Sequence, residues 1–372
     1  MLRKFCLLIF LVFPVFLELK AQETLLFIGS YNMDKGLPGI YIYSFDNKTG
    51  KLSRITEYAG VLNPSFLALS KNGRYLYACT ESRAAERGSV SSFKFDGQRL
   101  SLISQRLTGA ANPVYVALDK GEQWLLSGSY TGGGAAAFPL MENGEIGAAA
   151  QVFLFQDSSI RPQQKSAHVH SVNFSPDQQF VYLPDLGADK IRRFNFNASS
   201  PMPLSKETYS ATSAGSGPRH MAFHPNGRFA YCISELSGAV TAYLLSNGRL
   251  DSIQEIKLHQ QFYQSYSSAD IHLSPDGLFL YASNRGKENN IAILRLDPST
   301  GLLSTVGYQS TEGEHPRNFT IDPTGAFLLV ANEYSGDVIV FRRNLKTGLL
   351  YRTGNKIAVK GPSCLLMRKY GK

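Results

Sequence analysis

The sequence predicts an all-β fold, a seven-bladed β-propeller whose last blade is closed by the N- and C-terminal strands. Three observations support it. A polar turn followed by an aromatic-rich apolar run recurs six times, at a spacing close to fifty residues. Asn-Gly and Asp-Gly pairs separate many of the apolar runs, and helical periodicity is almost absent. Repeats of this length, built from short strands, are typical of propeller blades.

The six copies align on one turn residue, which is glycine in five of them. The first copy reads LSKNGRYLYACTE at 69–81, and the last reads IDPTGAFLLVANE at 321–333. Successive turn residues are 48, 57, 49, 50 and 48 positions apart, at Gly73, Gly121, Gln178, Gly227, Gly277 and Gly325. Asn-Gly and Asp-Gly supply the positive φ that tight hairpins need, so consecutive strands should pair antiparallel. We expect four strands in each unit.

The two ends of the chain carry complementary halves of a seventh unit. Residues 25–31 (LLFIGSY) match the second strand of a unit, and residues 361–367 (GPSCLLM) match a first strand. Pairing these two segments would complete one blade and leave no free sheet edge in the ring. Because repeats pack on their neighbours, residues 22–372 are expected to form a single seven-bladed domain.

Residues 1–21 differ from the repeats. Arg3 and Lys4 precede an apolar stretch from Phe5 to Leu17, and the segment ends at Ala21. A basic start, a short apolar core and a small final residue are typical of a secretory signal peptide, and the apolar stretch is too short to span a membrane. We therefore expect an exported protein, periplasmic or secreted, without membrane attachment after cleavage.

The composition limits the class of partner. The formal net charge is +9, but the basic residues are scattered without a Lys/Arg run, so no nucleic-acid partner is predicted. A mild positive excess also suits an anionic small substrate. Cys79, Cys232 and Cys364 each stand in an apolar run, and their odd number favours buried thiols over a disulfide framework. The oligomeric state is left open.

Aligning the units gives two columns of residues that should meet at one mouth of the central channel. In a propeller, strand one of each blade lines the channel, and the loops before strand one and after strand two should emerge at the same rim. The first column, at the start of strand one, is Ser65, Val114, His170, Arg219, Ala269, Arg317 and Ser363. The second column, just after strand two, is Glu81, Tyr130, Asp185, Glu235, Arg285, Glu333 and Tyr31.

A few members of these columns are not explained by the repeat. His170, Arg219 and Arg317 stand where the other units have small or apolar residues, and Arg285 is the only cation of the second column. His170 and Glu235 can accept a proton from water, while arginines bind carboxylate, phosphate or a developing oxyanion. The set indicates hydrolysis or proton transfer at a carbonyl; a structural hydrogen-bond network is the alternative.

Other chemistries are less well supported. His168 and His170 alternate along a strand as a metal pair would, but the sequence fixes no third ligand, so no metal site is predicted. The G-x-S-x-G signature of a serine nucleophile does not occur.

Several motifs resemble those of the seven-bladed propeller lactonase family, which includes bacterial 6-phosphogluconolactonases and the fungal carboxy-muconate lactonizing enzyme. They are HVHSVNFSPD at 168–177, GSGPRH at 215–220, ADIHLSPDG at 269–277, YASNRG at 281–286 and HPRN at 315–318. The resemblance covers residues 24–367 and implies a cofactor-free enzyme of carbohydrate metabolism that acts on a lactone. The histidine, two arginines and glutamate proposed for the fungal enzyme fall by motif on His170, Arg219, Glu235 and Arg285.

The resulting hypothesis is a metal-independent lactonase that hydrolyses an anionic sugar-acid lactone. Glu235 or His170 would activate water, while Arg219 and Arg285 would hold the anionic group and stabilise the oxyanion. Substrate binding would be supported or oriented by His168, His220, Asp270 and Arg317. The alternatives are a non-catalytic propeller that binds a glycan or a protein, and a lactonizing or isomerising enzyme. Export argues against a cytoplasmic sugar phosphate as the natural substrate.

Overall fold

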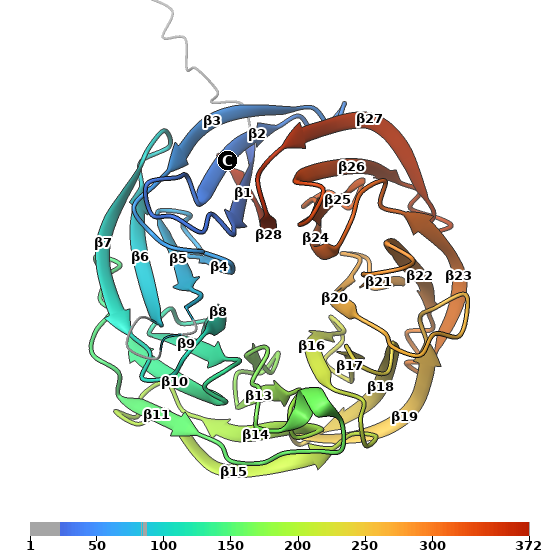
Figure 1. The fold of residues 1–372 in the computed structure, drawn as a ribbon, viewed down its shortest axis with the longest axis horizontal. Coiled ribbons are helices and arrows are strands. Elements are labelled where there is room, and N and C mark those ends of the chain that lie inside the picture. Colours follow the sequence, from blue (N-terminus) through green and yellow to red (C-terminus); the bar gives the residue numbers. More distant parts are fainter. Residues whose placement is uncertain (1–22, 83, 85–87, 372) are drawn as a thin grey trace, which may run out of the picture.

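The chain forms a ring of seven four-stranded antiparallel sheets around a central channel (Figure 1). A computed structural model describes residues 23–82, 84 and 88–371. Its sheet order confirms the predicted all-β, seven-bladed propeller. The predicted signal peptide, residues 1–21, lies outside the described residues.

Each sheet is one blade, and in six of the blades the strands follow chain order from the channel to the outer edge. Blade 1 consists of β4 (Leu67–Leu69), β5 (Tyr75–Thr80), β6 (Ser89–Phe95) and β7 (Leu100–Leu107). Blade 2 consists of β8 (Pro113–Leu118), β9 (Trp124–Ser129), β10 (Gly134–Pro139) and β11 (Gln151–Leu154). Blade 3 consists of β12 (Asn173–Phe174), β13 (Phe180–Asp185), β14 (Lys190–Phe196) and β15 (Leu204–Ala211), and a 3-10 turn, η2 (Pro162–Gln164), precedes it.

The remaining blades repeat this plan. Blade 4 consists of β16 (Pro218–Phe223), β17 (Phe229–Ser234), β18 (Ala239–Ser246) and β19 (Arg249–Lys257). Blade 5 consists of β20 (Ser268–Leu273), β21 (Phe279–Asn284), β22 (Asn290–Leu296) and β23 (Leu303–Ser310). Blade 6 consists of β24 (Pro316–Ile321), β25 (Phe327–Asn332), β26 (Asp337–Arg343) and β27 (Leu350–Ala358). Blade 7 consists of β28 (Pro362–Tyr370), β1 (Glu23–Ser30), β2 (Ile40–Phe45) and β3 (Leu52–Tyr58).

Blade 7 joins the two ends of the chain, as predicted. The C-terminal β28 is its channel strand and pairs antiparallel with β1, with Ile28 opposite Leu365 and Leu26 opposite Met367. A ring closed in this way has both of its terminal strands paired, which removes the sheet edge that an open array would expose.

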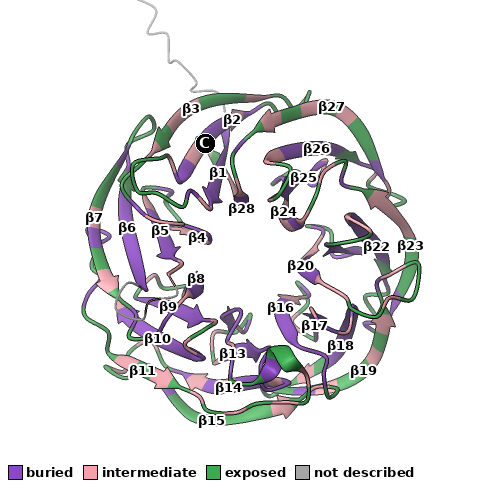
Figure 2. Cartoon of the chain, in the orientation of Figure 1, coloured by how far each residue is buried: buried purple, intermediate pink, exposed green. Residues whose placement is uncertain are grey.

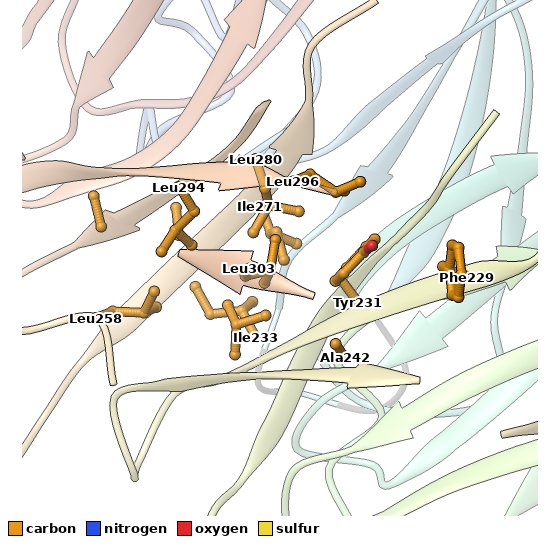
Figure 3. Packing of buried hydrophobic residues seen from close by; sticks show 13 residues of the cluster. Phe229, Tyr231, Ile233, Ala242, Leu258, Ile271, Leu280, Leu294, Leu296 and Leu303 are labelled. Carbon is orange, nitrogen blue, oxygen red and sulfur yellow. The ribbon is translucent and has the colours of Figure 1, made fainter. Parts of the chain in front are cut away.

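The apolar core lies between neighbouring blades. The inner strands are mostly buried, whereas the outermost strand of each blade carries mainly exposed and intermediate residues (Figure 2). Between blades 4 and 5, side chains from both sheets interdigitate (Figure 3). Fully burying one such aliphatic or aromatic side chain contributes about 1.5–3 kcal/mol. The described cluster comprises Phe229, Tyr231, Ile233, Val240, Ala242, Leu258, Ile271, Leu280, Ala282, Ala292, Leu294, Leu296 and Leu303.

A tyrosine in strand two ties blades 4 and 5 each to the following blade. The Tyr231 hydroxyl donates to the Gly301 carbonyl at 3.0 Å, and the Tyr281 hydroxyl donates to the Gly348 carbonyl at 2.7 Å. Gly301 has φ +77°, and a Cβ there would lie 2.4 Å from the Phe229 ring. These tyrosines and glycines are therefore scaffold residues.

The three cysteines of the described chain are free and buried, as predicted. Within the described residues, no helix has the length and apolar character needed to cross a membrane.

Candidate active site

One end of the channel opens into a cavity of about 250 Å³, here called the mouth. Its lining comes almost wholly from the two predicted columns, with Asn112 as the added residue. The loops before strand one and after strand two therefore do emerge on the same side. The lining residues are Tyr31, Glu81, Asn112, Val114, Tyr130, His170, Glu235, Arg285 and Arg317.

A bulge at the start of strand one presents the first-column side chains. In blade 4 the β16–β17 pairing passes from Pro218 to His220 and leaves Arg219 without a partner residue. In blade 6 the β24–β25 pairing leaves Arg317 unpaired in the same way. Bulges re-aim a side chain and are frequent beside active sites. The extra residue in each of these two strands is thus the one that the column singled out.

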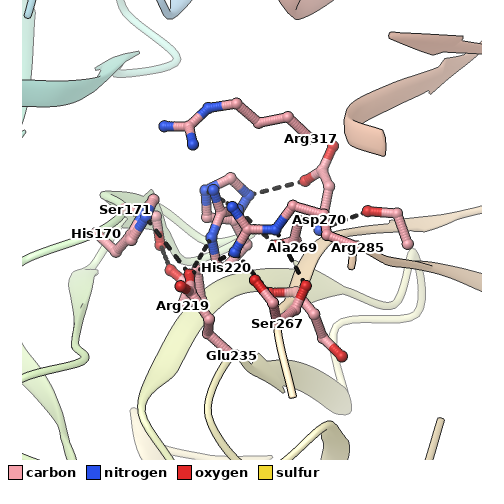
Figure 4. Close-up of polar contacts among 12 residues, drawn as sticks. His170, Ser171, Arg219, His220, Glu235, Ser267, Ala269, Asp270, Arg285 and Arg317 are labelled. Carbon is pink, nitrogen blue, oxygen red and sulfur yellow. Dashed lines mark hydrogen bonds and ion pairs between the residues drawn. The ribbon is translucent and has the colours of Figure 1, made fainter. Parts of the chain in front are cut away.

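Glu235 is held between two arginines (Figure 4). Its Oε2 lies 2.9 Å from Arg219 Nε and 3.0 Å from Arg285 Nη2. Burial acts to raise the pKa of Glu235, but Arg285, Arg219 and Arg317 outweigh it, and the pKa is lowered. Glu235 is therefore a carboxylate at neutral pH and a weak proton acceptor by itself.

His170 faces this carboxylate across a gap. Its Nε2 lies 4.0 Å from Glu235 Oε2, and its Nδ1 is buried without a hydrogen-bond partner in the described structure. Burial, followed by the charge of Arg219, lowers the pKa of His170 well below its usual value. The imidazole is therefore neutral at neutral pH. A gap of this size is too wide for a direct hydrogen bond and can be bridged by a water molecule that bonds to both groups.

Arg219 lies beneath the mouth rather than in its lining. Its guanidinium is buried and donates to Glu235, to the Ala269 carbonyl and to His220 Nε2, the last at 3.1 Å. Burial, followed by the charge of Arg285, lowers the pKa of Arg219 to about 10, so it stays a cation. This geometry makes Arg219 a support for Glu235.

Arg317 is in the lining, and its ion pairs are long. Its Nη2 lies 3.6 Å from Glu81 Oε1, and its Nε lies 3.8 Å from Glu333 Oε2. Its guanidinium also stands 5.1 Å from the centre of the Tyr31 ring. Burial acts to lower the pKa of Arg317, but Tyr31, Glu81 and Glu333 outweigh it, and the pKa is raised. With no tight partner among the described residues, Arg317 has donors available to a ligand.

Behind Arg219 runs a buried chain of polar groups. Asp270 Oδ1 lies 2.8 Å from His220 Nδ1, and its Oδ2 contacts His272 Nε2 at 2.9 Å and accepts from Asn318 Nδ2. Burial acts to raise the pKa of Asp270, but His272 and His220 outweigh it and lower the pKa. Because Asp270 is an ionised acceptor, His220 donates from Nδ1 and accepts from Arg219 at Nε2. His220 and Asp270, predicted to help with substrate, lie behind the lining.

His168 also stands behind the lining. Its ring stacks on the Tyr130 ring at 4.3 Å, and its Nδ1 lies 2.7 Å from the Tyr130 carbonyl oxygen. It therefore orients Tyr130, which does line the mouth. Asp185 of the second column turns away from the mouth and accepts from Arg192 Nε at 3.0 Å.

The described residues contain no group of three or more His, Cys, Asp or Glu side chains arranged to hold a metal ion. His168 and His170 are thus not joined by a third ligand of these types. The chemistry that the described side chains can supply is proton transfer and stabilisation of negative charge.

Comparison with known proteins agrees with this architecture. A family model described as "Lactonase, 7-bladed beta-propeller" matches residues 25–367. The chain belongs to this lactonase family. The 6-phosphogluconolactonase of Formosa agariphila is 42% identical over 351 residues, which are 93% of this chain and 99% of the relative. The 6-phosphogluconolactonase of Bacillus subtilis is 30% identical over 91% of this chain and 97% of its own length.

Two solved structures are also similar to this lactonase. A putative 6-phosphogluconolactonase from Bacteroides fragilis has a TM-score of 0.88 at 36% identity, covering 93% of this chain and 98% of that one. The periplasmic gluconolactonase of Pseudomonas aeruginosa has a TM-score of 0.88 at 35% identity, covering 93% and 99%.

Sequence reasoning did not single out three residues around Arg317 of this lactonase. Tyr31 donates to Glu81 at 2.6 Å, and burial raises the pKa of Glu333, whose Oε2 is buried without a hydrogen-bond partner in the described structure. All three stand in the second column, so the signal was present. The signal was overlooked because Glu recurs in this column, and a recurring Glu could equally be a hydrogen-bond acceptor that stabilises the blades.

Proposed function

We propose that this lactonase propeller hydrolyses a sugar-acid lactone, as a metal-independent enzyme of the 6-phosphogluconolactonase type. The observation that carries the proposal is the pairing of a neutral His170 with an arginine-clamped Glu235, 4.0 Å apart, in the wall of the mouth. The names of the relatives support a lactone as substrate. The two groups together supply what neither supplies alone, a base and a charge that stabilises its protonated form.

In the proposed reaction, a water molecule hydrogen bonded to His170 and Glu235 attacks the lactone carbonyl carbon. His170 takes the water proton, and the carboxylate of Glu235 stabilises the imidazolium that forms. A positioned base of this kind contributes typically about 10²–10⁴-fold. The proton then passes from His170 to the ring oxygen as the C–O bond breaks, which yields the open hydroxy acid.

Negative charge develops on the carbonyl oxygen during the attack. Arg317 and Arg285 both line the mouth, and Arg317 has the longer ion pairs, so its donors are available to this oxygen or to an anionic substituent. Removing one such donor costs about 10²–10³ in kcat in other enzymes. Arg219 acts as a positioning residue that fixes Glu235.

We also propose that residues 1–21 direct export and that the enzyme works outside the cytoplasm. The basic start and short apolar core of this segment support the proposal. Outside the cytoplasm, the enzyme would meet the lactone of an unphosphorylated sugar acid rather than that of a cytoplasmic sugar phosphate.

The test is hydrolysis of glucono-1,5-lactone, with and without a 6-phosphate, measured above the uncatalysed rate. Glu235→Gln and His170→Asn should each lower kcat/KM by about 10²-fold or more. Glu255→Gln, an exposed position on the outer strand of the same blade, is the matched control and should keep full activity. Absence of turnover with any aldonolactone, or full activity in both site variants, would refute the proposal.

A further inference from the structure

A second cavity, of about 370 Å³, adjoins the mouth. It lies between the loop 258–267, which precedes β20, and the residues that follow β21. Arg285 lines both this cavity and the mouth, so the two cavities meet at this side chain. A substrate whose lactone ring occupies the mouth could therefore extend into the second cavity.

The loop that forms this cavity is longer than its counterparts in the adjacent blades. Ten residues, 258–267, join β19 to β20, whereas six join β15 to β16 and five join β23 to β24. The added length carries Phe262, Tyr263 and Tyr266, all of which line the cavity. Phe262 is 89% exposed, so it contributes little to the packing of the blade. The repeat therefore does not account for this aromatic group.

The aromatic rings form one connected surface. Tyr266 packs against His259 at 4.5 Å, against Tyr263 at 6.1 Å and against Phe262 at 6.4 Å, measured between ring centres. Its hydroxyl accepts from the Tyr263 backbone amide at 3.2 Å. Rings held in this way offer apolar faces with polar edges. The C–H face of a sugar ring packs on such a surface, while its hydroxyl groups reach the surrounding polar side chains.

The charges of the lining do not suit a phosphate. Lys287 contributes a cation, but Glu288 contributes a carboxylate to the same wall. The donors of Arg285 are already engaged by Glu235 and by the Ser267 and Ser268 carbonyls. The charges of the lining are thus largely balanced. Its other polar members, Gln264, Ser265 and Ser267 among them, match the hydroxyl groups of a neutral sugar.

We propose that this cavity is a subsite for a glycosyl unit, and that the preferred substrate is the lactone of a disaccharide aldonic acid. The lactone ring would occupy the mouth, and the second sugar ring would stack on Phe262 and Tyr263. This inference rests on the proposed lactone hydrolysis, because it assigns a substrate class to the same site.

The experiment compares kcat/KM for cellobionolactone and maltobionolactone with kcat/KM for gluconolactone and for 6-phosphogluconolactone. The full-length enzyme should prefer at least one disaccharide lactone over gluconolactone by ten-fold or more. Phe262→Ala should reduce this preference at least five-fold, because an exposed ring can be removed without disturbing the core. Tyr351→Ala removes an exposed aromatic ring from the outer strand of blade 6 and should leave the preference unchanged.

Each other outcome has a distinct meaning. If none of these lactones is hydrolysed, the proposed function fails, and the subsite proposal, which rests on it, fails with it. If gluconolactone is hydrolysed without a preference for disaccharide lactones, or if Phe262→Ala keeps the preference, the subsite proposal is overturned. It is also overturned if the enzyme prefers the 6-phosphate and Lys287→Gln abolishes that preference, because the cavity would then bind a phosphoryl group.

Discussion

Asp270 contacts Arg219 through His220, so we expect it to hold Arg219 in position from outside the mouth, and the variant Asp270→Asn tests this role. The carboxylate accepts from His220 on one oxygen and from His272 and Asn318 on the other. An asparagine keeps the shape of the side chain, but its single acceptor oxygen is needed at the Oδ2 position, where His272 and Asn318 donate. Its NH₂ group would then face His220 Nδ1, which must become an acceptor.

The exchange propagates one residue further. Once His220 Nδ1 accepts, the ring proton moves to Nε2, which lies 3.1 Å from Arg219 Nη1. Two donors then face each other, and Arg219 loses that hydrogen bond. Leaving one buried donor unsatisfied costs about 1–3 kcal/mol. If this loss of free energy weakens the hold on Glu235 and so raises the transition state, kcat/KM falls by about 10–100-fold.

The assay is lactone hydrolysis at a temperature where the variant is folded, with Asp322→Asn as the matched control. Asp322 is an equally buried carboxylate that accepts from the Phe327 amide at 2.7 Å in a scaffold turn of blade 6. Its variant should lose stability and keep kcat/KM. A double-mutant cycle with Arg219→Lys should show that the two losses are not additive. Unchanged kcat/KM in folded Asp270→Asn would refute the chain of contacts as a positioning device.

Four further outcomes are expected. Arg317→Ala should raise KM or lower kcat by at least ten-fold, whereas Arg249→Ala on an exposed outer strand should do neither; equal effects would contradict the assigned role. Dialysis against EDTA should leave the hydrolysis rate unchanged, and a loss restored by a divalent metal would contradict the metal-independent mechanism. Conformational stability should fall as pH decreases from about 6.5 toward 4, because His170 and His220, with the pKa of His220 at about 4, stay neutral when folded and bind protons when unfolded. Each contributes a slope of up to about 1.4 kcal/mol per pH unit, so denaturant titrations that are flat over this range would contradict their burial as neutral groups. Mass spectrometry of protein recovered from outside the cytoplasm should place the N-terminus near Gln22, and an intact Met1 there would contradict cleavage of residues 1–21.

Nearly all of the fold could be predicted from the sequence, because a repeat encodes the same local rules several times. A glycine turn such as that at Gly227 and a strand-two tyrosine such as Tyr231 recur with one spacing, so the hairpins and the blade count follow. The split blade could be inferred because 361–367 and 25–31 are halves of one unit, and β28 does pair with β1.

The membership of the mouth could be predicted, but the pairing inside it could not. The columns place Asp185 beside Glu235 and Glu333, yet Asp185 turns toward Arg192 on the next strand of its own blade. Likewise the bulge that presents Arg219 leaves His220 facing Asp270. These pairings depend on the distances between side chains of different strands and blades. An alignment of the repeats contains no such distances.

The charges of the mouth explain why these pairings matter for the chemistry. Glu235 fully engages Arg219 and Arg285 at about hydrogen-bond length, whereas Arg317 lies 3.6 and 3.8 Å from its two carboxylates. One of those, Glu333, has its pKa raised by burial, which weakens its charge as a partner near and below that pKa. An arginine with distant partners is stabilised further when a nearer negative charge forms. A lactone carbonyl gains that charge only as water attacks, so we expect Arg317 to stabilise the transition state more than the neutral substrate.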